Sequence, residues 1–172
     1  IGNYNGTATK DFTIEQAPLT ITVDNSSKVY GAALPQFAIN YDGFVNSEDK
    51  SVLVGDIVFT TVATVSSNVG TYDVYASGLT AANYAITFVK GTLEVTKAPL
   101  TITVNPTTKV YGTDNPTFSV TYNGFVLEQN ESVLSGNLEF TTTATKDSDV
   151  DSYVVKASGL SSDNYAITYV DG

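Results

Sequence analysis

The sequence predicts an all-β protein built from two tandem copies of one unit. Thr, Val, Ser and Asn are abundant, and long stretches of the usual helix formers are absent, which favours pleated, half-buried strands. Residues 17–91 return 81 positions later as residues 98–172, and 41 of the 75 aligned positions are identical. A fixed period without insertions indicates tandem repeats. Apolar and polar residues also alternate within each copy, as expected of strands with one buried face.

The first half of each copy predicts two strands and a helical turn. Apolar residues alternate with threonines over residues 19–23, and residues 37–41 alternate in the same way before an Asp-Gly turn at 42–43. The segment 47–53 is typical of a single helical turn, with Ser47 as its N-cap.

The second half predicts further strands over residues 57–61 and 72–76. Residues 84–89 and 92–95 read as a hairpin joined at Lys90-Gly91. About six short strands per copy indicate a small sandwich or barrel and not a parallel α/β sheet.

The repeat alignment sets the expected domain boundaries. Repeat 1 spans residues 17–97, and repeat 2 spans residues 98–172. Residues 12–16 align with the last strand of repeat 1, so residues 1–16 are interpreted as the tail strand of a preceding domain or a linker. Lys97 leads into Ala98-Pro99 without a Gly/Ser linker, and proline holds such a segment extended. We therefore expect a stiff, rod-like junction.

Repeat 2 stops at Gly172, which matches Gly91, so it is expected to lack its final strand. An open sheet edge attracts foreign strands. We therefore consider strand exchange between chains, in which residues 10–16 of a neighbouring molecule fill the edge.

Charge and composition disfavour several classes of function. The net charge is −10, with eight Lys and no Arg, so neither nucleic acid nor an anionic membrane surface is an expected partner. No apolar run approaches the roughly 20 residues that span a bilayer. Cysteine is absent, which excludes disulfides and thiolate sites and, with the low charge, fits an exported surface repeat.

The residue inventory also argues against an enzyme. There is no His, no Cys and no Gly-rich phosphate loop, and acids that could pair for catalysis differ between copies, as Glu48 does from Gln129. No cofactor is expected.

One acidic run is a candidate metal site. Asp147, Asp149 and Asp151 alternate along a loop and could converge on Ca²⁺, which takes six to eight oxygen ligands. In the first copy the matching positions are Ser66, Asn68 and Gly70, so the unit folds without an acidic run. A solvated acidic loop is the interpretation we favour.

Aromatic residues recur in register. A sugar-binding platform is one interpretation, but most of these rings share alternating faces with Val and Ile, which favours core packing. Tyr75 is out of phase with the buried face, becomes Lys156 in the second copy, and is expected to be exposed. The recurring pairs are Tyr30 with Tyr111, Tyr41 with Tyr122, Tyr72 with Tyr153, and Tyr84 with Tyr165.

Lys28 and Lys109 recur next to a turn, where an exposed lysine is expected. The alternative is an amide crosslink to Asn83 or Asn164, which would need a buried Lys, Asn and carboxylate in contact.

Four motifs recur in both copies: Ala-Pro-Leu-Thr-Ile-Thr from Ala17 and Ala98, Lys-Val-Tyr-Gly from Lys28 and Lys109, Tyr-x-Gly-Phe-Val from Tyr41 and Tyr122, and Asn-Tyr-Ala-Ile-Thr from Asn83 and Asn164. These motifs resemble the MBG-type (YGX) repeats of bacterial cell-surface proteins and adhesins. The resemblance covers nearly the whole chain and implies an extracellular, cell-surface location and a role in adhesion or display. It also implies two tandem Ig-like β-sandwich repeats in a rod, and a β-grasp-like unit is the alternative.

Two functions follow from this organisation. A stalk or spacer of a surface adhesin should keep its core and let exposed loops drift between copies, and residues 32–34 and 65–66 do differ from 113–115 and 146–147. The alternative is that the repeats bind host glycan, mucin or matrix protein directly, with weak affinities summed over many copies. The loop drift favours the spacer.

Overall fold

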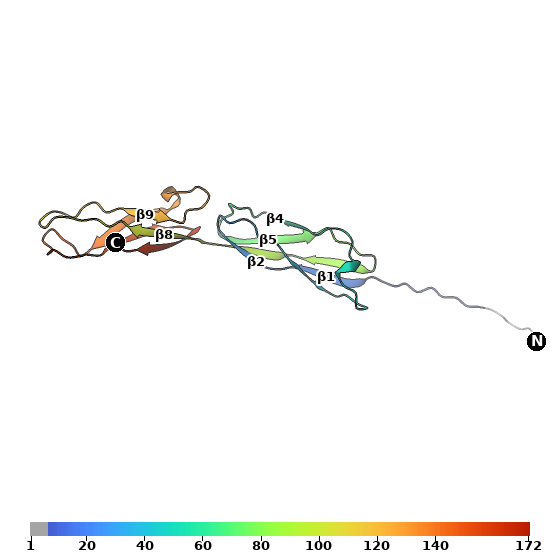
Figure 1. Cartoon of the computed structure of the whole chain (residues 1–172). Coiled ribbons are helices and arrows are strands. Elements are labelled where there is room, and N and C mark those ends of the chain that lie inside the picture. The colour runs from blue at the N-terminus through green and yellow to red at the C-terminus, as the bar shows by residue number, and fades with distance from the viewer. Residues whose placement is uncertain (1–6) are drawn as a thin grey trace, which may run out of the picture. The chain divides into compact units, whose positions relative to one another are not determined.

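In the computed structural model of the chain, residues 7–172 are described, and they form strands, two short 3-10 helices and no α-helix (Figure 1). The all-β prediction is confirmed. No helix within this described part has the length and apolarity needed to cross a membrane.

The strands follow the repeat. The first copy contains β1 (Ala17–Val23), β2 (Ser26–Val29), β3 (Ile39–Asp42), η1 (Lys50–Val52), β4 (Val58–Thr61), β5 (Gly70–Ser77), β6 (Tyr84–Val89) and β7 (Gly91–Thr96). The second copy contains β8 (Ala98–Val104), β9 (Val120–Asn123), η2 (Glu131–Val133), β10 (Ser135–Thr142), β11 (Val155–Ser161) and β12 (Tyr165–Val170).

Each copy has a three-stranded sheet whose first strand lies in the centre. In the first copy the order is β3-β1-β6, with β1 antiparallel to β3 and parallel to β6. The second copy repeats this as β9-β8-β12 with matching register, so that Ile21 pairs with Tyr41 and Ile102 pairs with Tyr122. The alternation pattern did not predict the parallel pairs, because apolar and polar residues alternate in the same way in parallel and antiparallel strands.

The second sheet differs between the copies. The first copy has four strands in the order β2-β7-β5-β4, with β2 parallel to β7. The second copy has only β10 and β11, the counterparts of β4 and β5. Residues 107–110, the counterpart of β2, do not form a strand.

The chain forms two compact units whose limits differ from those of the repeats. The first unit runs up to Asp24 and includes Ala38–Thr60 and Val74–Gly91. The second unit contains Asn25–Phe37, Thr61–Asp73 and Thr92–Gly172. The second unit thus holds all of repeat 2 together with three segments of repeat 1.

Each unit has its own buried core. In the first unit Leu19, Ile21 and Tyr84 are buried, and apolar residues of β3 and β6 pack against them. In the second unit Leu100 and Ile102 of β8 are almost fully buried. Burying each such side chain contributes about 1.5–3 kcal/mol to folding.

Two local predictions were wrong. β6 and β7 do not form a hairpin, because β6 pairs with β1 while β7 lies in the other sheet. The chain changes sheets at Lys90-Gly91, where a Cβ on Gly91 would lie 2.5 Å from the Val23 carbonyl oxygen. The helical turn at 47–53 exists as η1, but Ser47 is not its cap.

Asp49 caps η1 in place of Ser47. Its Oδ1 accepts the backbone N–H of Ser51 at 2.8 Å, and Asn130 accepts that of Ser132 at 3.0 Å in the second copy. Ser47 instead takes a left-handed conformation, with φ of 60°. The cap lies two residues later than predicted because the turn is a short 3-10 helix.

Candidate functional site

The acidic run lies on an exposed loop of the second repeat. Asp147, Asp149 and Asp151 are all exposed on their loop. Among residues 7–172, no three acidic side chains lie close enough to hold a metal ion. Asp151 Oδ1 instead accepts the neighbouring Ser152 N–H at 2.7 Å, and the Asp149 carbonyl accepts the Tyr153 hydroxyl at 3.1 Å.

The recurring tyrosines have different environments. Tyr84 and Tyr165 are buried in equivalent places, and each packs edge-to-face on a neighbouring Phe. Tyr30 is only 4% exposed, whereas its counterpart Tyr111 is 63% exposed. Tyr75 is exposed, as predicted. Most of the rings pack in the core. The difference in exposure between Tyr30 and Tyr111 indicates that a neighbouring group covers Tyr30 and leaves Tyr111 open to solvent.

Lys28 is buried, so the prediction of an exposed lysine was wrong. Its ammonium donates to the carbonyl oxygens of Ala32 at 2.9 Å and Val65 at 3.0 Å. Burial lowers the pKa of the Lys28 ammonium, because the charged form loses hydration. These partners are main-chain carbonyls, and neither is the side-chain amide of Asn83 that the crosslink would need. Lys109 donates to the carbonyl oxygens of Thr113, the counterpart of Ala32, and of Thr145, in a more open setting.

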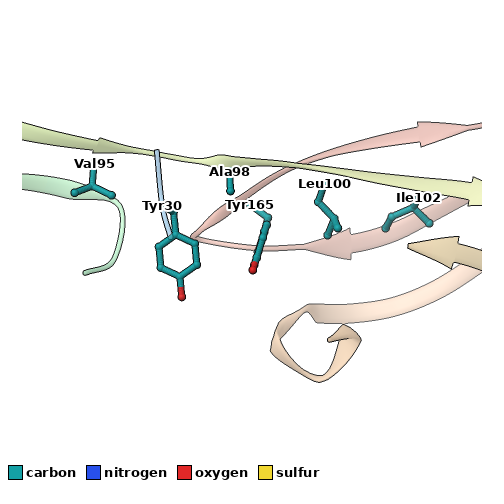
Figure 2. Close-up of a cluster of buried hydrophobic side chains, with 6 residues drawn as sticks. All are labelled: Tyr30, Val95, Ala98, Leu100, Ile102 and Tyr165. Carbon is teal, nitrogen blue, oxygen red and sulfur yellow. The ribbon is translucent and has the colours of Figure 1, made fainter. Parts of the chain in front are cut away.

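The side chain that covers Tyr30 belongs to repeat 2, within the same compact unit. The rings of Tyr30 and Tyr165 meet edge-to-face, with centroids 5.6 Å apart and an interplanar angle of 81° (Figure 2). Figure 2 shows Val95, Ala98, Leu100 and Ile102 along one continuous ribbon beside the two rings. This cluster joins the end of repeat 1 to repeat 2.

Hydrogen bonds reinforce this inter-repeat contact. Gln129 Nε2 donates to the Tyr30 hydroxyl at 3.0 Å, while Gln129 Oε1 accepts the Tyr165 hydroxyl at 2.7 Å. Asn164 donates to the Asn68 side chain at 2.9 Å and accepts the Val69 N–H at 3.0 Å. Polar groups on both sides are therefore paired across the repeat boundary.

Gly31 lets the two surfaces approach closely. A Cβ at Gly31 would lie 2.5 Å from Cγ2 of Val126 in repeat 2, and the residue has φ of +80°. Gly112, its counterpart, has φ of +82° and no atom within 4 Å of the same point. The Tyr-Gly pair of repeat 1 is thus part of a contact that the pair of repeat 2 does not make within this chain.

The described residues of repeat 2 also form an open groove of about 450 Å³. Its walls include Thr107 to Lys109 on one side and Asp151 to Val155 on the other. The matching segments in repeat 1, β2 and the start of β5, flank β7 as its hydrogen-bonded neighbours. The groove therefore lies where repeat 1 holds β7.

Sequence reasoning missed the inter-repeat contact. The alignment gave identical residues, Tyr30 and Tyr111, at positions that differ in exposure. One signal was available: Glu48 becomes Gln129, an exchange that supplies an N–H donor. We interpreted this exchange as variation between the copies. The local sequence patterns around Tyr30 and around Gln129 do not show that the two residues are in contact.

Comparison with known proteins agrees with the repeat organisation. A family model described as the MBG domain (YGX type) matches twice, at residues 19–94 and 100–172. No curated protein and no solved structure matches the chain. The chain therefore belongs to the MBG domain family of the YGX type, of which it carries two tandem copies.

Proposed function

We propose that the two repeats act as a spacer in a bacterial surface adhesin, on the extracellular side, with no catalytic role of their own. The observation that carries the proposal is the contact between Tyr30-Gly31 and repeat 2. Only Lys97 separates β7 from β8, and the side chains on both sides of it are buried or paired. A spacer needs such a fixed connection, because a flexible one would not hold a distal domain at a set distance.

The differences between the copies also support a spacer. The buried residues of the two central strands are identical, since β1 and β8 share the sequence Ala-Pro-Leu-Thr-Ile-Thr-Val. The exposed segments 32–34 and 113–115 differ completely. A repeat that bound the same ligand in each copy would be expected to present the same exposed side chains.

A binding array tests this function. The folded, fluorescently labelled chain is applied to glycans, mucins and matrix proteins, once with Ca²⁺ and once with EDTA. A spacer predicts no reproducible binding above that of the unfolded protein under either condition. Binding to one chemical class that is lost on unfolding would contradict the proposal and favour direct adhesion by the repeats.

A further inference from the structure

The part of repeat 1 that contacts repeat 2 consists of two loops that are far apart in the sequence. The first loop, residues 30–32, follows β2, and the second loop, residues 64–69, precedes β5. Both loops belong to the second compact unit. A surface built from two separate loops keeps one shape only when the loops are fixed to each other. Such preorganisation strengthens a contact, because less conformational freedom is lost when the contact forms.

Each loop contacts repeat 2 through its own residues. The Tyr30 ring of the first loop packs edge-to-face on Tyr165. In the second loop, the Asn68 side chain accepts the side-chain N–H of Asn164 at 2.9 Å, and the Val69 N–H donates to Asn164 Oδ1 at 3.0 Å. Because Asn164 and Tyr165 are adjacent in the sequence, the two loops meet at the same place on repeat 2.

The side chain of Lys28 connects the two loops. Its ammonium donates to the carbonyl oxygen of Ala32 in the first loop at 2.9 Å and to that of Val65 in the second loop at 3.0 Å. Lys28 is only 6% exposed, and it is the one buried charged side chain among residues 7–172. A buried charge that loses its hydrogen-bond partners costs free energy, so the ammonium holds both carbonyls close to one nitrogen atom.

The main chain of Lys28 is anchored to the strand that leads into repeat 2. Lys28 lies opposite Val95 in the parallel pair of β2 and β7. Its carbonyl oxygen accepts the Thr96 hydroxyl at 3.3 Å, and the Tyr30 N–H donates to the Thr96 carbonyl oxygen at 2.8 Å. The ammonium is therefore positioned from β7, the strand that Lys97 alone separates from β8.

We propose that Lys28 is a positioning residue of the inter-repeat contact, in which its ammonium ties the two loops into one surface that receives Asn164 and Tyr165. Both hydrogen bonds described for the ammonium go to repeat 1, so Lys28 acts through the loops. Without this tie, each loop would be free to move by itself. The proposal rests on the fixed connection that the spacer function needs, and it identifies the side chain that fixes this connection.

Nuclear magnetic resonance on the variant Lys28→Met tests the proposal. Methionine is unbranched and flexible, so it fills the space of the lysine stem without the ammonium. We expect the Val69 amide, which is bonded to Asn164 across the repeat boundary, to exchange its hydrogen about ten-fold faster than in the unmodified chain. Gly31 lies close enough to the Val126 methyl groups to give a nuclear Overhauser effect, and this effect should weaken in the variant. These two signals report on the contact.

Two amides inside repeat 1 show whether the variant keeps its fold. The Val54 N–H donates to the Thr80 carbonyl oxygen at 2.8 Å, and the Tyr30 N–H donates to that of Thr96 at 2.8 Å. Their exchange should stay as slow as in the unmodified chain. A lysine that only stabilised the fold of repeat 1 would, when replaced, accelerate these two amides together with that of Val69, and this result would overturn the proposal.

The variant Lys109→Met is the matched control. Lys109 is the counterpart of Lys28, and its ammonium donates to the carbonyl oxygens of Thr113 and Thr145, neither of which belongs to the two loops. This variant should leave both signals of the contact unchanged. The variant Lys28→Arg keeps a positive charge with several N–H donors. Both signals should therefore stay closer to those of the unmodified chain than in Lys28→Met, and signals as weak as in Lys28→Met would overturn the proposal.

The same measurements separate the proposal from the spacer function. Unchanged signals of the contact in the folded Lys28→Met variant would overturn the proposal and leave the spacer function standing, because the contact would then form without the tie. Losses of equal size in Lys28→Met and Lys109→Met would also overturn the proposal. If the unmodified chain shows fast exchange at Val69 and no nuclear Overhauser effect between Gly31 and Val126, both are overturned, because there is no fixed contact for Lys28 to position.

Discussion

Glu48 and Gln129 occupy equivalent positions but meet different neighbours. The Tyr84 hydroxyl donates to the Glu48 carboxylate at 2.5 Å, and this bond raises the pKa of Tyr84. Gln129 accepts from Tyr165 in the same way and also donates to Tyr30. A carboxylate only accepts hydrogen bonds, whereas an amide both accepts and donates. A single residue exchange thus fits the second copy to the preceding repeat.

The Gly31 and Gly112 positions give a matched test of the inter-repeat contact. Alanine at either position takes the same left-handed strain, since the φ values are +80° and +82°. Only at Gly31 would the methyl group overlap Val126. Such an overlap typically lowers the free energy of unfolding by about 1–3 kcal/mol more. In urea unfolding we therefore expect Gly31→Ala to lose more stability than Gly112→Ala. Equal losses would show that the contact with Val126 is not formed in solution.

The two helix caps differ in their response to acid. Hydrogen bonds from Ser51, first through its side chain and then through its N–H, lower the pKa of Asp49 below its usual value of 3.8. The folded state therefore gains stability from Asp49 above pH 3.8, and this gain is lost as the pH falls through the lowered pKa. Asn130, the equivalent cap, does not titrate.

Nuclear magnetic resonance can read the two caps separately. As the pH falls below 3.8, the Ser51 amide signal should move as Asp49 is protonated, while the Ser132 amide should stay in place. In the variant Asp49→Asn neither amide signal should move as the pH falls. Movement of the Ser132 signal over the same range would mean that the change is not local to the cap.

At the scale of elements, β2 shows how a strand depends on its neighbour. Ser26–Val29 is a strand because it pairs with β7, and the matching residues 107–110 are not. The two segments are chemically close, Ser-Ser-Lys-Val against Thr-Thr-Lys-Val. The pairing of Ser26–Val29 with β7 is therefore what makes these four residues a strand in the first copy.

This dependence explains what could be predicted from the sequence. The strands with strong alternation, such as β1 and β6, were predicted because their pattern is local. β2 was missed because its four residues carry no such pattern. The hairpin between β6 and β7 was wrongly predicted, because short sequence separation favours pairing but the partner of β6 is β1. The presence of two tandem copies was predicted correctly, because the repeat can be recognised from residue identities alone.

At the scale of the whole molecule, the repeats and the compact units divide the chain differently. The second unit contains repeat 2 and the Tyr30 and Asn68 segments of repeat 1. Residues from two copies of the family thus share one core, in which Val95 and Tyr30 lie with Leu100 and Tyr165. The connection between the copies is therefore a packed element of the molecule and not a tether.

The measurement that tests this account most directly is the distance distribution between two spin labels across the inter-repeat contact. The chain has no cysteine, so Val62→Cys and Lys156→Cys, both exposed and both in the second unit, introduce the labels cleanly. Thr117→Cys with Lys156→Cys serves as a control within repeat 2.

We predict a single distribution across the contact that is as narrow as the control, and a much broader one after five Gly/Ser residues are inserted between Lys97 and Ala98. A distribution in the unmodified chain as broad as in the insertion variant would contradict the fixed inter-repeat contact and, with it, the spacer function.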